Sequence, residues 1–593
     1  MFSQLRRYIL TTLLLIFCLP RSHWACTLNS GAQEKQKDWW QTGQFYQIYP
    51  RSFMDSDGDG IGDLKGVTSK LEYLKDIGVT AAWLSPIFTS PMVDFGYDIS
   101  DFYDIQPEYG TMDDFRELIA RAKELDLKII LDFVPNHSSN ESEWFKKSVA
   151  RERGYEDYYV WVDARYDENG NRIPPSNWLQ AFRGSAWEWN EQRQQYYLHQ
   201  FTVQQPDLNY RNPAVVNQMK RILRYWLEQG VAGFRCDAVP VLFEVLPDEN
   251  GIYPDEEKSG LTNDPDDRSY LKLDLIENQP ETIDMIYQWR QVMDDHQRIY
   301  GGDTRVLLIE TYAPAWYTMQ MYGNSTTEGA HLPFNFNLIT ELENGVSATK
   351  VLKAVDDWLL NMPAGRTANW VMGNHDRGRA ATRFGPERVD AMNMLVMILP
   401  GASVTYQGDE IGMTDGDVSW EESKDPAACN TNSSIYQKYS RDPERTPFQW
   451  NTEKNAGFST ATQTWLPVAD NYETVNVEVE LAADRSHIKV YKSLVELRDS
   501  SKTLQYGDWK YKALNENIFV VKRYLSGSET IIYISNLGDS AETIDLTTNF
   551  DTTLPETMNI KISSVDSKKT EGSTLQLNNI SLEVGEGLVL STA

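Results

Sequence analysis

The stretch KIILDF, residues 128–133, is one of eight short apolar runs that alternate with helical patterns between about Gln44 and Gly408. Amphipathic segments such as MDDFRELIARAKEL (112–125) lie between the runs. Because strands that alternate with helices form a parallel sheet, eight such units predict an α/β fold with a closed (β/α)8 TIM barrel. A doubly wound open sheet is the alternative, but it normally has fewer strands, and no glycine-rich nucleotide loop follows the first run. The other seven runs are FYQIY (45–49), AAWLS (81–85), VAGFR (231–235), VLLIE (306–310), LPFNF (332–336), NWVMG (369–373) and SVTYQ (403–407).

Two stretches break this alternation. Residues 138–205 are rich in Trp, Tyr, Asn and charged residues without a clear helix–strand unit, so we expect a small domain (domain B) inserted after the third strand. After about residue 500 the pattern changes to alternating strands such as IFVVKRYL (518–525), which predict a C-terminal antiparallel β-sandwich. The expected domains are the barrel at 38–137 and 206–495, domain B at 138–205 and the C-terminal domain at 500–593.

The N-terminal region has the order of a secretory signal peptide. Arg6 and Arg7 precede an apolar run from Ile9 to Leu19, and small residues follow near Ala25. Because this run of eleven residues is far shorter than the roughly 20 that span a bilayer, we expect a signal peptide at residues 1–25 and no transmembrane segment. The C-terminal GEGLVLSTA is too short an apolar stretch for a lipid-anchor signal. These features predict a secreted, extracellular protein, with the gut lumen as one location that would suit it.

Charge and cysteine content narrow the classes of partner. The formal net charge is −30, from 86 acidic and 56 basic residues, which repels nucleic acid and favours a small neutral substrate. Cys18 lies in the expected signal, Cys26 lies beside its cleavage site, and Cys236 and Cys429 are far apart, so neither a disulfide framework nor a zinc site is indicated. The oligomeric state is left open. Four glycosylation sequons in surface-like contexts fit the secretory route, and a fifth, at Asn136, is expected to be buried; the four are Asn140, Asn324, Asn432 and Asn579.

Four of the expected strands end in acidic, histidine or hydrogen-bonding residues. An acidic residue at a single strand end is more often a helix cap than a catalyst, but four successive clusters are hard to explain in that way. Because catalytic groups in a β/α barrel lie at the carboxyl ends of the strands, the clusters predict an active site. They are DFVPNH (132–137), GFRCDAV (233–239), LLIETY (307–312) and GNHDRGR (373–379).

Taken in order, these clusters resemble the signature segments of glycoside hydrolase family 13, the α-amylase family. QQPDLN (204–209) looks like the additional segment of the oligo-1,6-glucosidase subfamily, and YQIYPRSFMDSDGDGIGDLKG (46–66) resembles the insect maltases of that group. The resemblance covers nearly all of the chain after the expected signal. It implies a secreted retaining exo-acting α-glucosidase that releases α-glucose from maltose, sucrose and short malto-oligosaccharides by double displacement.

The resemblance assigns a catalytic trio. Asp237 matches the nucleophile, Glu310 the acid/base, and Asp376 the carboxylate that stabilises the transition state and holds sugar hydroxyls. In the retaining mechanism the two reacting carboxylates start in different protonation states, which their surroundings must enforce. Arg235 lies two residues before Asp237 on the same strand, so it faces the same side and can keep the nucleophile ionised.

The resemblance also implies sugar-binding residues. His137 and His375 match positions that hydrogen-bond glucose. Asp98 in GYDISD matches the residue that binds the terminal glucose hydroxyls, and Tyr97 is expected to border that ring. Arg441 in RDPERTPFQW looks like the distal arginine that pairs with Asp98, although Arg445 lies close by in the sequence and keeps this assignment open; a pocket blocked behind the terminal glucose would enforce exo action.

The segment DSDGDGIGD (55–63) spaces oxygen ligands at alternate positions with glycines between them, as calcium loops do. It lacks the Glu at the twelfth position and the flanking helices of an EF-hand, and an acidic turn without metal is the alternative. Because similar loops in the resembling family bind calcium away from the chemistry, we expect a structural, non-catalytic calcium ion. The expected ligands are Asp55, Asp57, Asp59, Asp63 and the carbonyl of Ile61.

Linkage preference is expected to depend on the residue after the nucleophile. In the resembling subfamily a Val there accompanies α-1,6 preference and a smaller residue accompanies α-1,4 preference. Ala238 occupies the position here, which predicts maltose and sucrose over isomaltose. Two alternatives stay open: a transglucosidase or isomaltase of the same family, and a catalytically silent binding or receptor protein like the amino-acid transporter heavy chains.

Overall fold

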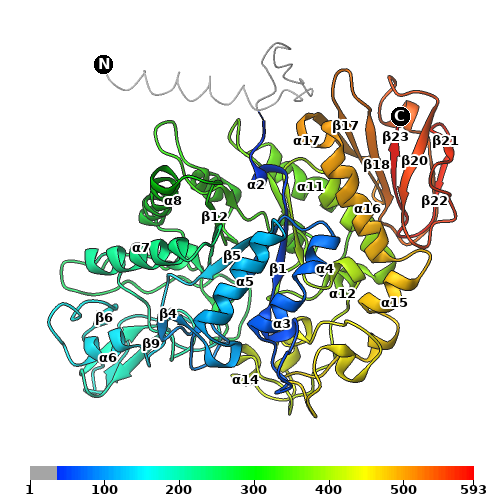
Figure 1. The fold of residues 1–593 in the computed structure, drawn as a ribbon. Coiled ribbons are helices and arrows are strands. Elements are labelled where there is room, and N and C mark those ends of the chain that lie inside the picture. Colours follow the sequence, from blue (N-terminus) through cyan, green and yellow to red (C-terminus); the bar gives the residue numbers. More distant parts are fainter. Residues whose placement is uncertain (1–35, 593) are drawn as a thin grey trace, which may run out of the picture. The chain divides into compact units, whose positions relative to one another are not determined.

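The computed structural model describes residues 36–592, so the expected signal peptide, Cys18 and Cys26 lie outside the described residues. Eight parallel strands form one sheet, confirming the barrel, and all eight coincide with the apolar runs of the sequence. The order around the sheet is β13-β12-β11-β5-β2-β1-β15-β14 (Figure 1). The strands are β1 (Gln44–Ile48), β2 (Ala81–Leu84), β5 (Lys128–Phe133), β11 (Gly233–Cys236), β12 (Val306–Ile309), β13 (Leu332–Pro333), β14 (Asn369–Val371) and β15 (Ala402–Tyr406).

One asparagine side chain joins the two end strands of this sheet. β13 is only two residues long and pairs with β12, so ladder bonds to β14 are missing. The fully buried Asn369 amide takes their place: its Oδ1 accepts from the Asn335 N–H at 2.9 Å and its Nδ2 donates to the Pro333 carbonyl at 2.6 Å. Because strand side chains alternate in direction, every second residue points inward and fills the barrel. Phe45, Trp83, Ile130, Leu308, Phe334 and Val404 belong to this inner cluster.

The helices around the barrel follow the amphipathic segments. α5 begins with a capping box between Thr111 and Asp114 and buries Phe115 and Leu118. α13 differs because all ten of its residues are buried, as expected for a helix that is covered on both sides. Its outer side meets the C-terminal domain, where the hydroxyl of Tyr533 donates to the Ala391 carbonyl at 2.9 Å. The main helices are α3 (Leu64–Ser69), α4 (Leu71–Asp76), α5 (Met112–Glu124), α7 (Pro213–Glu228), α8 (Pro280–Tyr300), α11 (Ala348–Leu359), α13 (Val389–Ile398) and α16 (His487–Ser500).

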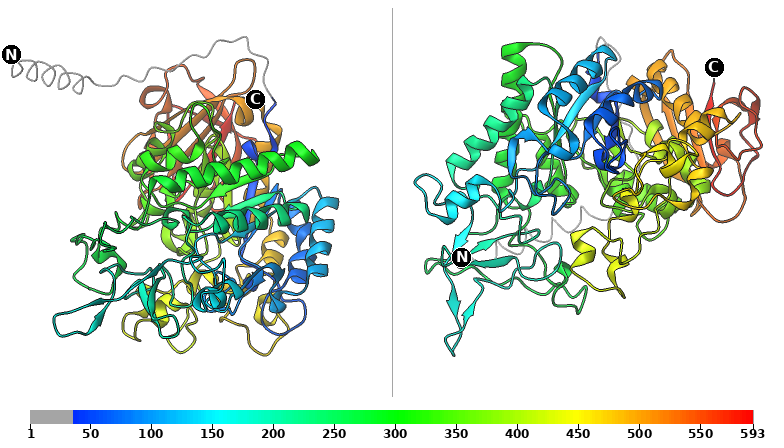
Figure 2. Two further views of the ribbon diagram at one scale, coloured as in Figure 1. Left: turned by 90° about the vertical axis from the view of Figure 1, so that its left-hand side faces the viewer. Right: turned by 60° about the horizontal axis from the view of Figure 1, so that its bottom comes forward.

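Three long segments follow strands at the carboxyl end of the barrel. Domain B, between β5 and α7, contains α6 (Glu143–Val149), a three-stranded sheet of β6 (Trp161–Val162), β10 (Gln195–Leu198) and β9 (Trp187–Asn190), and the hairpin of β7 (Arg165–Tyr166) and β8 (Arg172–Ile173). The segment between β15 and α15 (Val477–Ala482) lies beside it, with the Asn430 amide donating to the Phe182 carbonyl at 2.8 Å (Figure 2). A third segment, 237–279, was not anticipated; its Tyr253 and Ile276 share an apolar cluster with Trp178 of domain B.

The C-terminal domain is the expected antiparallel β-sandwich. Its six-stranded sheet has the order β16-β17-β18-β23-β20-β21 and packs through Ile532 and Leu590 against a second sheet of β19 and β22. Among residues 36–592, no helix is both long and apolar enough to cross a membrane. The strands are β16 (Asp508–Ala513), β17 (Ile518–Tyr524), β18 (Ile531–Asn536), β19 (Glu542–Ile544), β20 (Thr557–Ser563), β21 (Thr574–Gln576), β22 (Ile580–Leu582) and β23 (Gly587–Ser591).

Candidate active site

The four strand-end clusters meet in one cavity of about 320 Å³, a size within the range of small-ligand sites. Asp237, Glu310 and Asp376 all line it. A larger cavity of about 870 Å³, between domain B and residues 424–435, contains none of these carboxylates. We therefore place the candidate active site in the smaller cavity, by its chemistry rather than its size.

One arginine holds both carboxylates that were assigned to bond cleavage. Arg235, on β11 and almost fully buried, places Nη1 at 2.5 Å from Oδ1 of Asp237 and Nη2 at 2.8 Å from Oε2 of Glu310. Asp132 at the end of β5 accepts from the same Nη1 at 2.9 Å and helps to hold the guanidinium in place. Glu310 Oε2 also accepts from the Ala238 N–H at 2.8 Å. The sequence assigned Arg235 to the nucleophile alone, whereas the structure has it contact both groups.

Burial raises the pKa of both of these carboxyl groups. It raises the pKa of Glu310 to about 8, and the neighbouring Asp237 and Asp376 carboxylates reinforce the shift against the opposing charge of Arg235. Burial also raises the pKa of Asp237, to about 7, with the Arg235 guanidinium again opposing it. Burial thus favours the protonated form of both groups, and the Arg235 guanidinium, 2.5 Å from Asp237, favours the ionised form of that carboxylate. This is the arrangement that an acid/base and a nucleophile need.

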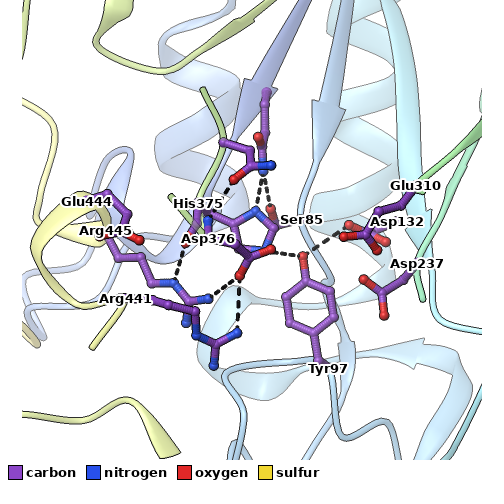
Figure 3. A network of polar contacts seen from close by, with 12 residues as sticks. Ser85, Tyr97, Asp132, Asp237, Glu310, His375, Asp376, Arg441, Glu444 and Arg445 are labelled. Carbon is purple, nitrogen blue, oxygen red and sulfur yellow. Dashed lines mark hydrogen bonds and ion pairs between the residues drawn. The ribbon is translucent and has the colours of Figure 1, made fainter. Parts of the chain in front are cut away.

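Asp376, after β14, is held ionised by a different group of charges. Its Oδ1 accepts from Nη2 of Arg445 at 2.8 Å and from Nη1 of Arg441 at 3.1 Å. Burial would raise the pKa of Asp376, but His375, Arg441 and Arg445 outweigh it and hold the pKa well below its ordinary range. Because burial lowers the pKa of His375 and keeps that ring neutral, the two arginines are the lasting source of positive charge. Figure 3 shows them on the opposite side of Tyr97 from Asp237 and Glu310.

The assignment of Asp98 is wrong, and Asp94 takes its place. Asp98 is fully buried and does not line the cavity. Its carboxylate accepts hydrogen bonds from Ser90 Oγ and from the N–H groups of Val93 and Asp94. Asp94 lines the cavity, and its Oδ1 lies 3.0 Å from Nη2 of Arg441. Arg441 therefore pairs with an aspartate of the GYD region as expected, but with the one that precedes the motif. Asp98 instead shapes the turn that presents Asp94.

Tyr97, His137 and His375 all line the cavity, as the resemblance implied. The rings of Tyr97 and His375 are stacked 5.4 Å apart, and the Tyr97 hydroxyl lies 2.7 Å from His375 Nε2. Gln47 of β1 contacts the other ring nitrogen of His375 at 2.7 Å. His137 Nε2 lies 3.1 Å from the Tyr97 carbonyl oxygen, and burial lowers the His137 pKa to about 3. Both histidines are thus neutral hydrogen-bonding groups with fixed rings.

The end of the cavity near Asp94 is walled by domain B. Phe182 and Phe201 line it there, and the Arg441 guanidinium lies 4.7 Å from the centre of the Phe182 ring. Arg441 is itself held by the fully buried Asp425, which accepts from its Nη2 at 2.6 Å and from its Nε at 3.0 Å. No motif pointed to Asp425, Phe182 or Phe201, because they come from irregular segments that only the fold brings together.

The acidic loop brings three of its five expected ligands together. Ligand atoms of Asp55, Asp57 and Asp63 lie within 4.8 Å of one another, and within residues 36–592 this is the one such group of three acidic, His or Cys side chains. Asp59 lies outside the group, and its carboxylate accepts from the Ile61 N–H at 2.8 Å. None of the five loop residues lines the catalytic cavity, so this loop takes no part in its chemistry.

Comparisons with known proteins agree with this geometry. Residues 47–507 match the family described as the α-amylase catalytic domain. The chain is 54% identical to Maltase A1 of Drosophila melanogaster over 517 residues, covering 86% of this chain and 89% of that protein. It is 49% identical to a salivary α-glucosidase of Anopheles gambiae, with 93% of each chain covered. Among solved structures, the α-glucosyl transfer enzyme XgtA superposes with a TM-score of 0.81 at 31% identity, covering 94% of this chain and all of that chain.

Proposed function

The chain belongs to the α-amylase family of glycoside hydrolases, and from this premise we propose that it is a retaining, exo-acting α-glucosidase. Its substrates would be maltose, sucrose and short malto-oligosaccharides, which are neutral α-glucosides. The observation that carries the proposal is the pair of buried carboxylates, Asp237 and Glu310, that both contact the Arg235 guanidinium. The relatives named maltase and α-glucosidase support the same activity.

The proposed reaction runs in two displacements. Glu310 donates its proton to the glycosidic oxygen while the Asp237 carboxylate attacks the anomeric carbon, which breaks the glycosidic bond and forms a covalent β-glucosyl ester. Glu310, now ionised, takes a proton from water as the water oxygen attacks the same carbon. The ester bond breaks, Asp237 regains its charge, and α-glucose leaves. Asp376 stays ionised throughout and can bind the sugar hydroxyls as positive charge develops on the ring.

Exo action is supported by the walled end of the cavity. A glucose ring that reaches Asp237 and Glu310 would have Asp94 and Arg441 beyond it, and these two are tied together and backed by Asp425. A longer chain could not continue past this ion pair without separating buried charges, which is costly. The enzyme would therefore release one glucose at a time from the non-reducing end.

Measuring the products formed from maltose and sucrose tests this function directly. We expect the purified protein to release glucose from maltose and sucrose, and the α-anomer to form first when the reaction is followed by polarimetry or NMR. Initial release of β-glucose would contradict the retaining mechanism. Disaccharide products in place of free glucose would favour the transglucosidase alternative, which the similarity to XgtA supports. No turnover by folded protein would favour the silent binding protein.

Ala238→Val is expected to shift the preference from maltose toward isomaltose. Ala238 lines the cavity directly after the nucleophile and has left-handed backbone angles (φ 50°, ψ 31°). A β-branched side chain is strained in this region, so we also expect the variant to lose roughly 1–2 kcal/mol of stability. The measurement is the ratio of kcat/KM values for maltose and isomaltose, with Ala238→Gly as a control that relieves the backbone without adding bulk. An unchanged ratio in the Val variant would contradict the linkage argument.

We also propose that Asp55, Asp57 and Asp63 hold a structural calcium ion. Chelation is then expected to lower the melting temperature, since an ion present at a hundredfold its Kd contributes about 2.7 kcal/mol. The exposed Asp57→Asn is the variant that tests the site, because Asp63 also caps α3 through the Gly66 N–H and cannot be changed without disturbing that helix. This variant should melt lower and respond less to chelator. A melting temperature of the wild type that does not move with chelator would exclude a resident ion.

Secretion is the proposed location, supported by the relative named a salivary α-glucosidase. Of the four sequons expected on the surface, Asn324, Asn432 and Asn579 are exposed and Asn140 is half-buried. Asn136 is buried, as expected, and its Nδ2 donates to Asp207. The four accessible asparagines are therefore the proposed glycosylation sites.

A further inference from the structure

The open end of the cavity is lined by an ion pair that the mechanism leaves unused. Arg268 and Glu277 both line the cavity and both come from the segment 237–279, which follows the nucleophile. Arg268 Nη2 lies 2.8 Å from Glu277 Oε1, and the two side chains are 16% and 28% exposed. The walled end holds Asp94, His137 and His375, which are nearly inaccessible, so this more exposed pair lies toward the side where substrate enters.

The arginine of this pair is fixed by domain B. Arg268 Nη1 donates to the Leu179 carbonyl at 3.0 Å, and Nη2 is 3.4 Å from Oε1 of Gln200. Gln200 in turn donates to the Val241 carbonyl at 2.9 Å. Glu277 accepts only from Arg268, so its second carboxylate oxygen has no protein partner within residues 36–592. The pair thus presents one free acceptor in a fixed position.

A backbone hydrogen bond ties the segment of Glu277 to the loop that follows the nucleophile. Asn278, with a left-handed φ of 58°, donates its N–H to the Pro240 carbonyl at 2.8 Å. Pro240 follows Ala238 by two residues, and the Ala238 N–H binds Glu310. Pro240, Val241 and Glu277 line the same cavity as Glu310, so they form a wall that a sugar attached through the bond that Glu310 protonates can contact.

This geometry points to a role in leaving-group recognition: we propose that the Arg268–Glu277 pair binds the hydroxyls of the second sugar, which makes a neutral saccharide the preferred leaving group. The inference rests on the proposed α-glucosidase function. A carboxylate oxygen accepts from sugar hydroxyls and a guanidinium donates to sugar oxygens, and bonds to charged groups are the stronger kind. Arg268 alone would attract an acidic leaving group, but Glu277 neutralises it and leaves the wall suited to an uncharged polyol. Tyr312, which is 41% exposed and lines the same cavity, adds an aromatic face on which a ring can stack.

The test compares a disaccharide with an aryl glucoside, which lacks the hydroxyls of the second sugar. Glu277→Ala is expected to lower kcat/KM for maltose about tenfold or more, mainly through KM, because a hydrogen bond to a charged group is lost. The value for 4-nitrophenyl α-glucoside should stay within about twofold, since the glucose side of the cavity is intact. Glu277→Gln keeps the shape and one acceptor oxygen, so it should recover part of the loss for maltose.

Glu257→Ala is the matched control, because Glu257 forms an exposed ion pair with Lys272 in the same segment but does not line the cavity. It should behave as wild type with both substrates. An equal loss with maltose and the aryl glucoside in Glu277→Ala, or no loss with maltose, would overturn the proposal. A wild-type protein that cleaves neither substrate would instead contradict the α-glucosidase function itself, so the two failures are distinguishable.

Discussion

Asp237→Asn is expected to lower kcat for maltose by about 10⁴-fold or more, the size of effect that follows loss of a covalent nucleophile. The amide has nearly the shape of the carboxylate and can still accept from Arg235, but it cannot form the glucosyl ester. Folding should not suffer. Burial raises the pKa of Asp237 to about 7, so an ionised Asp237 costs folding free energy at neutral pH, and the neutral amide removes that cost. The variant should therefore melt at or above the wild-type temperature.

The role of Asp237 can be separated from a general loss of activity by chemical rescue. In Asp237→Ala, azide can occupy the vacated space and attack α-glucosyl fluoride directly, which would displace fluoride and give β-glucosyl azide by a single inversion. The same addition to Asp376→Ala should yield no inverted product, because the nucleophile is still present there. Formation of β-glucosyl azide only in the Asp376 variant would show that the two carboxylates had been assigned the wrong way round.

The eight strands could be located from sequence because their signal is local. Each is a short apolar run between polar segments, and burial on both faces of a parallel strand requires such a run. The three carboxylates assigned to catalysis could be brought to one site for a related reason: Asp237 and Glu310 stand directly after their strands and Asp376 lies in the loop after β14, where the barrel directs side chains into one cavity. Their protonation states could not be read in the same way. They depend on burial and on the charges of Arg235, Arg441 and Arg445, and both are set only in the folded chain.

The error at Asp98 has a physical explanation. DFGYD (94–98) offers two carboxylates four residues apart, and composition does not say which one faces the cavity. In the structure Asp98 accepts from two backbone N–H groups in its own turn, a local role that aspartate commonly takes, and this leaves Asp94 directed at Arg441. The conformation of this turn decides which aspartate faces the cavity, and the sequence fits either choice.

The residues that form the walls of the cavity could not be predicted from sequence patterns. Phe182, Arg268, Glu277 and Asp425 lie in irregular segments without helical or strand periodicity, far apart in the chain. They meet because three long segments leave the same end of the barrel and pack on one another. Loops of this kind vary in length and course without a local code, so the residues that form the walls of the cavity can be identified only from the fold.

Glu310→Gln is expected to lower kcat/KM for maltose by about 10³–10⁴-fold, but to spare substrates whose leaving group needs no proton. The glutamine can still accept from the Ala238 N–H and keep its place beside Arg235, so positioning is preserved. With 2,4-dinitrophenyl α-glucoside the first step should run at nearly the wild-type rate. The glucosyl ester would then persist, because water has lost its base, and a burst of dinitrophenol equal to the enzyme concentration should appear. Azide, which needs no base, should restore turnover and give α-glucosyl azide, opposite in configuration to the product from Asp237→Ala.

The pH profile adds a second signature of the same residue. In the wild type, kcat/KM should fall on the alkaline side as Glu310 loses its proton, because burial raises the pKa of Glu310 to about 8. On the acid side kcat/KM should fall as Asp237 gains a proton. The two limbs belong to an interacting pair, so the apparent constants describe both groups together. In Glu310→Gln the alkaline limb should vanish while the acid limb remains. A profile that keeps its alkaline limb in this variant would assign that proton to another group, and Glu310 would then be a positioning residue for Arg235 and not the acid.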